Sequence, residues 1–351
     1  MEIYTRLAKT LDALPSGFPS TGDGSELRLL ERLFTPKEAG LAVLLTSKLE
    51  TSESIAARTG LDAGDLRELL KQMARNGLIA RGKIKGGLGF GLMPFIVGIY
   101  EEQVGRLDEE LARLVEDYFQ RAFVQALKVQ PQFHRVVPIG ENVRNSMEVH
   151  PYESASALVN AAQAWGVLDC ICRKQKSMIG ETCGHPIDVC MALYEQPGVF
   201  DNNPVIHAVS REEALATLER AAKAGLVHSV SNSKEGINYI CNCCTCSCGI
   251  LRGMVSLGMA NVVARSAFVS TVDAIMCNGC GECLSFCQFN ALKVDDIIEI
   301  DPQRCVGCGI CVPACPSEAL ILVRRPDEEI LPIPETPEAW RAQRAAARGL
   351  K

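Results

Sequence analysis

Two closely similar cysteine runs near the C-terminal end constrain this chain more than any other feature of its sequence. CNGCGECLSFC extends from Cys277 to Cys287, and CVGCGICVPAC extends from Cys305 to Cys315. In each run the four thiols are separated by two, two and three residues. The repetition predicts a pair of ligand loops that complete one another.

Cys-x2-Cys-x2-Cys-x3-Cys is the spacing that holds [4Fe–4S] clusters, and in two-cluster proteins the fourth cysteine of each run ligates the other cluster. On this rule one cluster is held by Cys277, Cys280, Cys283 and Cys315, and the second by Cys305, Cys308, Cys311 and Cys287. Glycines inside both loops permit backbone conformations in which amides point at the cluster sulfurs. These glycines are Gly279, Gly281, Gly307 and Gly309.

The stretch 266–323, about one-sixth of the chain, resembles the bacterial two-cluster ferredoxin family. The proline that follows the last cysteine in that family is present as Pro316 but is replaced by Gln288 in the first run. The resemblance implies a ferredoxin-like βαββαβ domain that carries two [4Fe–4S] clusters and transfers single electrons. A zinc ribbon is the alternative, but zinc sites usually use two separated Cys-x2-Cys pairs.

The whole chain has 351 residues and 17 cysteines, and its N-terminus lacks the basic flank and apolar stretch of a secretory signal. These features favour reduced, metal-binding thiols in the cytoplasm over a disulfide framework. The apolar stretch 88–100 is too short to span a bilayer, and 251–276 is interrupted by Arg252 and Arg265. The net charge of −6 suits a partner with a basic surface rather than nucleic acid.

Nine further cysteines form two groups in the middle of the chain, which is too many for packing. They are Cys170, Cys172, Cys183, Cys190, Cys241, Cys243, Cys244, Cys246 and Cys248. We expect at least one additional iron–sulfur cluster here, with zinc as the second choice. His185 is a further ligand, a residue that supports the ligands without binding the metal, or a surface residue. Arg173, Lys174 and Lys176 either stabilise thiolates or form a solvated surface.

This block contains CxCR, GxxCxHP, GLVH and CNCCxCxC pieces and resembles a cysteine-rich module attached to ferredoxin domains in iron–sulfur proteins of anaerobes. It does not match the CCG spacing of heterodisulfide reductase subunits, which disfavours disulfide reduction. In CNCCTCSC, an extended backbone would place Cys241 and Cys243 on one face and the other three thiols on the opposite face. A helix would instead gather Cys241, Cys244 and Cys248.

Four helical patterns and a glycine-rich hairpin follow one another over residues 26–100, and this order resembles a winged helix. The candidate recognition helix DLRELLKQMAR mixes Asp65 and Glu68 with basic residues, so DNA binding is disfavoured, although Arg81, Lys83 and Lys85 could contact phosphates. A structural or dimerising module is the favoured interpretation. The stretch 101–128 is predicted to continue as one amphipathic helix.

The predicted fold class is therefore multidomain α+β. Its parts are a winged-helix-like module (1–128), a cysteine-rich α/β region (129–265), a ferredoxin-like domain (266–323) and a proline-rich tail with a short helix (324–351). The favoured function is an electron carrier that serves a partner oxidoreductase. A redox-sensing winged-helix regulator and a reductase with a catalytic iron–sulfur site in the cysteine-rich block are the alternatives.

Overall fold

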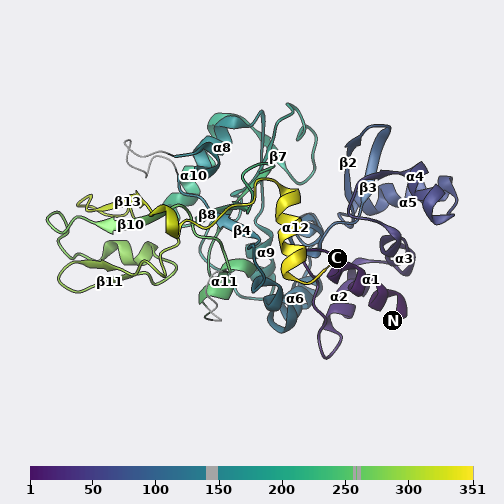
Figure 1. The fold of residues 1–351 in the computed structure, drawn as a ribbon, viewed down its shortest axis with the longest axis horizontal. Coiled ribbons are helices and arrows are strands. Elements are labelled where there is room, and N and C mark those ends of the chain that lie inside the picture. The colour runs from purple at the N-terminus through teal and green to yellow at the C-terminus, as the bar shows by residue number, and fades with distance from the viewer. Residues whose placement is uncertain (140–148, 256–257, 259–261, 351) are drawn as a thin grey trace. The chain divides into compact units, whose positions relative to one another are not determined.

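The computed structural model describes residues 1–139, 149–255, 258 and 262–350, and the chain divides into two compact units (Figure 1). The first unit contains Met1–Val129 with Met178–Gly180 and Arg341–Lys351. The second contains Gln130–Ser177 and Glu181–Trp340. Both units combine helices with strands, so the chain is a multidomain α+β protein. Within the described ranges, no helix has the length and apolar character needed to cross a bilayer.

Helices and one small sheet build the first unit. The helices are α1 (Glu2–Asp12), α2 (Ser25–Leu33), α3 (Pro36–Leu44), α4 (Ser52–Thr59) and α5 (Ala63–Arg75). The strands are β1 (Glu50–Thr51), β2 (Ala80–Ile84) and β3 (Gly87–Gly91), in the antiparallel order β1-β3-β2. Asp62 begins α5 by accepting hydrogen bonds from the backbone of Gly64 and Asp65, and Leu66, Leu70 and Met73 form its buried face.

The single helix predicted over 101–128 is wrong at its N-terminal end. A 3₁₀ helix covers Glu101–Gly105, and α6 begins at Glu109 and ends at Tyr118. The chain then continues through a π-helical turn, Phe119–Phe123, into α7 (Val124–Leu127). Asp108 separates the two segments because its backbone is extended and its side chain accepts a hydrogen bond from Leu111 N at 2.9 Å.

A six-stranded antiparallel sheet forms the centre of the second unit, in the order β4-β8-β9-β6-β5-β7. Its strands are β4 (His134–Val136), β5 (Ala164–Leu168), β6 (Cys190–Tyr194), β7 (His207–Val209), β8 (Val227–Ser231) and β9 (Tyr239–Cys243). The accompanying helices are α8 (Ala155–Ala161), α9 (Ile171–Met178), α10 (Arg211–Lys223) and α11 (Gly249–Val255). Ser210 and Glu213 form a capping box at the start of α10. Buried Val159, Leu193, Leu218 and Val230 contribute to the core between helices and sheet.

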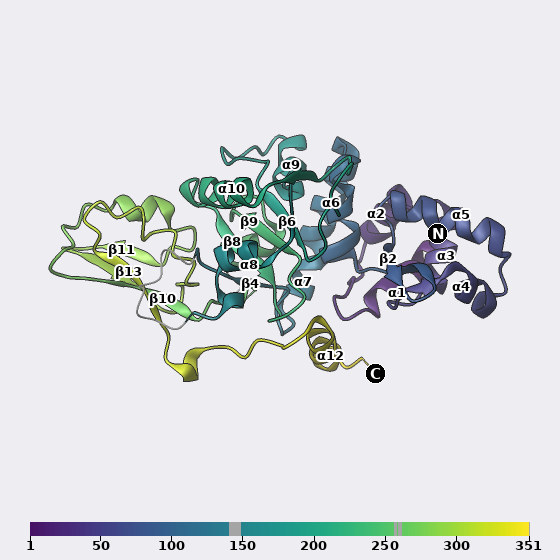
Figure 2. The same cartoon turned by 90° about the horizontal axis from the view of Figure 1, so that it is seen from above.

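Two short antiparallel pairs frame the stretch 266–323 (Figure 2). β10 (Phe268–Val272) pairs with β13 (Leu320–Arg324), and β11 (Leu292–Val294) pairs with β12 (Ile298–Ile300). The first of the two expected helical segments is a 3₁₀ helix, Glu282–Phe286, and the corresponding segment of the second run is a turn. Both segments contain the same pair of backbone hydrogen bonds, from Leu284 and Cys287 in one run and from Val312 and Cys315 in the other.

The end of the chain is packed rather than free. Helix α12 spans Pro337–Ala347, and its Arg344 side chain is completely buried. The guanidinium donates hydrogen bonds to the carbonyl oxygens of Pro15 at 3.0 Å and Val129 at 2.6 Å, and also to that of Ala126. Because these bonds satisfy a buried charge, they fix the last residues within the first unit.

Candidate metal centres

The two C-terminal cysteine runs fold into loops with matching backbone geometry. Gly279 and Gly281 have φ of 68° and 75°, and Gly307 and Gly309 have φ of 71° and 72°. A Cβ atom on Gly307 would lie 2.1 Å from the carbonyl oxygen of Phe268, and one on Gly279 would lie 2.5 Å from that of Asp296. Glycine is therefore required at Gly279 and Gly307 both by the dihedral angle and by the close backbone approach, and it is favoured at Gly281 and Gly309 by the dihedral angle.

The loops bring thiols of both runs close enough for their charges to act on one another, across the two loops as well as within each loop. The charges of Cys277, Cys280 and Cys315 act on Cys283, and burial combines with them to raise its pKa to about 11. Burial and the charges of Cys305 and Cys287 likewise raise the pKa of Cys311 to about 12. Burial, together with the charges of Cys311, Cys305 and Cys287, also raises the pKa of Cys308. Ligation of clusters by the two interleaved sets of four cysteines remains a prediction.

Backbone donors point at the fourth cysteine of each run. Ala291 N donates to Cys287 Sγ at 3.3 Å, and Ala319 N donates to Cys315 Sγ at 3.3 Å. Ser270 Oγ also lies 3.3 Å from Cys311 Sγ. Hydrogen bonds of this kind stabilise the negative charge of thiolates bound to iron. Four thiols per set and these donors fit the requirements of [4Fe–4S] clusters.

Six of the nine remaining cysteines meet at one end of the central sheet. Strands β5, β6 and β9 are antiparallel neighbours, so the end of β5, the start of β6 and the end of β9 lie at the same edge. Each of the six thiols influences the pKa of two others in the group, so the six form a closed ring of neighbours. In order around this six-cysteine ring they are Cys170, Cys172, Cys248, Cys243, Cys241 and Cys190.

Arg173 supplies a buried positive charge beside the six-cysteine ring. Its side chain is only 3% exposed, and its Nη1 donates to the carbonyl oxygen of Asn242 at 2.9 Å and to Cys244 Sγ at 3.8 Å. Burial opposes its charge, but the charges of Cys170 and Cys190 and of Cys244 raise its pKa. Within the described ranges, its Nε and Nη2 have no hydrogen-bond partner. Such donors are expected where an anionic group binds.

The interpretation of Arg173, Lys174 and Lys176 as a solvated surface is wrong for two of the three residues. Arg173 and Lys176 are both 3% exposed, whereas Lys174 remains partly exposed. Lys176 forms an ion pair with Glu181, and Lys174 forms one with Asp169 at 3.5 Å. The difference arises because α9 packs one face against the cysteine-rich end of the sheet, and a run of basic residues occupies both faces of a helix.

The other three cysteines of the block form a separate group with His185. One ligand atom from each of Cys183, His185, Cys244 and Cys246 lies within 4.8 Å of all the others. Cys183 Sγ is 4.0 Å from Cys244 Sγ, and Cys246 Sγ is 3.7 Å from His185 Nδ1. Burial opposes ionisation of Cys183, but hydrogen bonds from Ser247 and His185 lower its pKa to about 6. We call this group the Cys–His tetrad.

Gln288 joins the ferredoxin-like loops to the cysteine-rich block. Its Oε1 accepts a hydrogen bond from Thr245 N at 2.6 Å, and its Nε2 donates to the carbonyl oxygens of Gly225 and Cys243. Thr245 lies between Cys244 and Cys246, and Gln288 directly follows Cys287. The residue that replaces the expected proline therefore connects two thiol-bearing segments. The sequence alone did not indicate this role.

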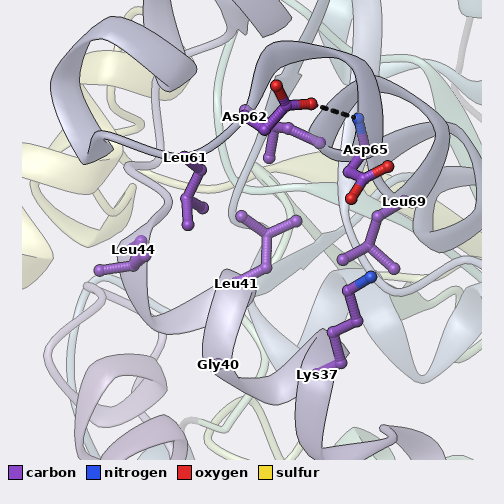
Figure 3. A pocket seen from close by; sticks show the side chains of 9 residues that line it. Lys37, Gly40, Leu41, Leu44, Leu61, Asp62, Asp65 and Leu69 are labelled. Atoms are coloured by element: carbon purple, nitrogen blue, oxygen red, sulfur yellow. Dashed lines mark hydrogen bonds between the residues drawn. The ribbon is translucent and has the colours of Figure 1, made fainter.

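An apolar pocket of about 300 Å³ lies in the first unit, between α3 and α5 (Figure 3). Leu41, Leu61 and Leu69 line it, and Lys37 and Asp65 add charge to its wall. Its lining contains neither cysteine nor histidine, so the pocket is separate from the metal centres.

A protein-family model described as a 4Fe-4S dicluster domain matches residues 276–319, which include all eight cysteines of the two runs. No curated protein and no solved structure matches the chain. The C-terminal part is therefore an iron–sulfur, ferredoxin-like domain that binds 4Fe–4S cofactors. Together with the cysteine groups described above, this match supports a role in iron–sulfur electron transfer.

We predict that Gln288→Leu loosens the contact between the ferredoxin-like loops and the block. The substitution leaves the partly buried Thr245 N–H without its acceptor, which should cost about 1 kcal/mol of unfolding free energy. Denaturant unfolding of the anaerobically purified protein measures this loss. Gln303→Leu, at an exposed position just before the second run, is the matched control and should leave stability nearly unchanged. Equal effects of the two substitutions would argue against the bridging role.

Proposed function

We propose that this protein passes electrons between a partner oxidoreductase and an internal chain of iron–sulfur clusters. Two [4Fe–4S] clusters are bound by the C-terminal loops, and at least one additional cluster is bound by the six-cysteine ring. The observation that carries the proposal is the Gln288 bridge, because it holds the residue after Cys287 against the backbone of Cys243. Cys287 and Cys243 belong to different thiol groups, so the bridge provides a short connection between two clusters.

The six-cysteine ring suits an iron–sulfur cluster for two reasons. Four thiolates suffice for one cluster, and the ring offers six that lie close enough to influence one another's pKa. The buried guanidinium of Arg173 has two unpartnered N–H groups in the described structure, and donors of this kind stabilise anionic clusters. When bound, the cluster supplies one-electron redox chemistry, while the protein positions it and excludes water.

One end of the proposed series of clusters is accessible to a partner protein. Cys280, in the first C-terminal loop, is exposed, whereas Cys305 and Cys311 in the second loop are buried. Electron exchange with another protein requires a cluster near the surface, so we assign this task to the cluster held by the first loop together with Cys315. The second cluster then lies between it and the ring.

We further propose that the N-terminal unit is a winged-helix-like module used for protein contacts or dimerisation. Its order of helices and its β1-β3-β2 sheet support the comparison. The charge of helix α5 is mixed, since Arg67, Lys71 and Arg75 lie beside the carboxylate of Glu68, which pairs with Lys71 at 2.8 Å. Asp65 adds a further negative charge to its first turn. Duplex DNA binding depends on several basic groups that neutralise phosphates.

The protein should therefore show no salt-sensitive, sequence-selective binding to duplex DNA. Electrophoretic mobility shifts with a random-sequence library, followed by selection and sequencing, provide the test. Lys83→Glu and Lys85→Glu in the exposed hairpin supply the internal comparison, because they would abolish a genuine phosphate contact. A selected duplex whose binding disappears in these variants would contradict the proposal.

We predict that the full chain, purified or reconstituted without oxygen, contains more iron than the about eight atoms of two [4Fe–4S] clusters. Replacing alternate members of the six-cysteine ring with serine leaves three thiols, fewer than one cluster needs. The variant Cys172→Ser/Cys190→Ser/Cys243→Ser should therefore lose the excess iron and sulfide and retain the EPR signals of the C-terminal clusters.

Cys280→Ser is the reciprocal control, since it should alter the EPR signals of the C-terminal pair and keep the excess iron. Persistent C-terminal signals in the triple variant also show that its second unit is folded. Iron content unchanged by the triple substitution would overturn the assignment of the ring.

A further inference from the structure

The nine cysteines of the block separate completely into two sites of different size. Six form the ring, and the remaining three form the Cys–His tetrad with His185. Within CNCCTCSC the assignment changes along the chain: Cys241, Cys243 and Cys248 face the ring, whereas Cys244 and Cys246 face the tetrad. The two sites therefore share a segment of backbone but no thiol.

We propose that the Cys–His tetrad binds a single zinc ion, distinct from the iron–sulfur clusters. Two sulfurs bound to one tetrahedral zinc at about 2.3 Å lie about 3.8 Å apart. Cys183 Sγ and Cys244 Sγ are 4.0 Å apart, and all four ligand atoms lie within 4.8 Å of one another. In a [4Fe–4S] cluster each cysteine sulfur binds a different iron, so the sulfurs are spread more widely than on a single ion.

The donor set also favours zinc. Three thiolates and one imidazole form one of the usual ligand sets of structural zinc sites, and four protein ligands leave no open position for a substrate. The ligands come as two short pairs, Cys183 with His185 and Cys244 with Cys246, from segments about 60 residues apart in the chain. An ion shared by both pairs would fix the connection between α9 and β6 to the turn after β9.

Polar groups around the tetrad fit the charge of such a site. Zinc with three thiolates and a neutral imidazole carries one net negative charge. Arg173 Nη1 lies 3.8 Å from Cys244 Sγ, and Ser247 Oγ lies 3.4 Å from Cys183 Sγ. Donors to ligating sulfurs are a regular feature of metal sites, where they orient the ligands and offset the charge.

The position of the ion gives it a structural task in electron transfer. Thr245, whose N–H binds Gln288, lies between two of the tetrad's ligands. A zinc ion would therefore hold in place the turn against which the ferredoxin-like loops pack. This consequence rests on the proposed function, whereas the zinc site itself does not.

The test is a separate measurement of zinc and iron in the full chain, purified without oxygen and dialysed against one equivalent of zinc. We expect about one zinc per chain. Cys183→Ser/Cys246→Ser, which removes one ligand from each pair, should reduce zinc to trace amounts and leave iron unchanged. His185→Cys, which preserves four ligand atoms, should retain the zinc. The triple ring variant is the reciprocal control and should lose iron but keep zinc.

Cobalt substitution gives a second readout that does not depend on stability. The native tetrad should produce intense sulfur-to-cobalt charge-transfer bands after Co²⁺ loading, and the double variant should lack them. Zinc absent from the native chain, or iron lost from the double variant while zinc is unaffected, would overturn the proposal. If the zinc contents are as expected but the native chain contains no excess iron, the zinc site is supported and the cluster in the six-cysteine ring is rejected.

Discussion

Antiparallel pairing of three neighbouring strands is the constraint on which the centre of this protein depends. Because β5, β6 and β9 alternate in direction, the end of β5, the start of β6 and the end of β9 meet at one edge. The sequence places cysteines at each of these ends, from Cys170 after β5 to Cys190 in β6 and Cys243 in β9. Thiols that are up to about 80 residues apart in the chain therefore gather without a dedicated binding loop.

The ferredoxin-like stretch depends on local sequence, in contrast to the central sheet. Its two loops carry their own glycines, backbone donors and cysteines within short runs. The Gln288 side chain connects the ferredoxin-like stretch to the central sheet, since its amide forms hydrogen bonds with Thr245 N and with the carbonyl oxygen of Cys243. A proline at this position, which has no side-chain donor or acceptor, could not make the same contacts.

Features encoded over short distances were predictable from the sequence. The two cysteine runs predict the iron–sulfur domain, which the family match confirms. Asp108 could have indicated the break before α6, because aspartate is a strong N-cap residue. The grouping of thiols in CNCCTCSC followed the extended pattern through Cys246, and only Cys248 departed from it, because the chain turns at Thr245 and α11 begins at Gly249.

Long-range contacts were not predictable in the same way. His185 meets Cys246 across 61 residues, and Gln288 meets Thr245 across 43, and no local spacing encodes either pair. Burial of Arg173 depends on which face of α9 packs against the sheet, and a run of basic residues does not specify that face. Such contacts depend on the tertiary arrangement of the second unit, which the periodicity of single segments leaves open.

An EPR-monitored redox titration of the anaerobic full chain tests the central claim most directly. The claim is that the six-cysteine ring holds a cluster next to the C-terminal pair. We predict at least three one-electron reductions, with the signal of the additional cluster broadened or split once its C-terminal neighbour is reduced, because paramagnetic clusters held close together interact. Only two reductions, or a third whose signal is insensitive to the state of the other clusters, would contradict the account.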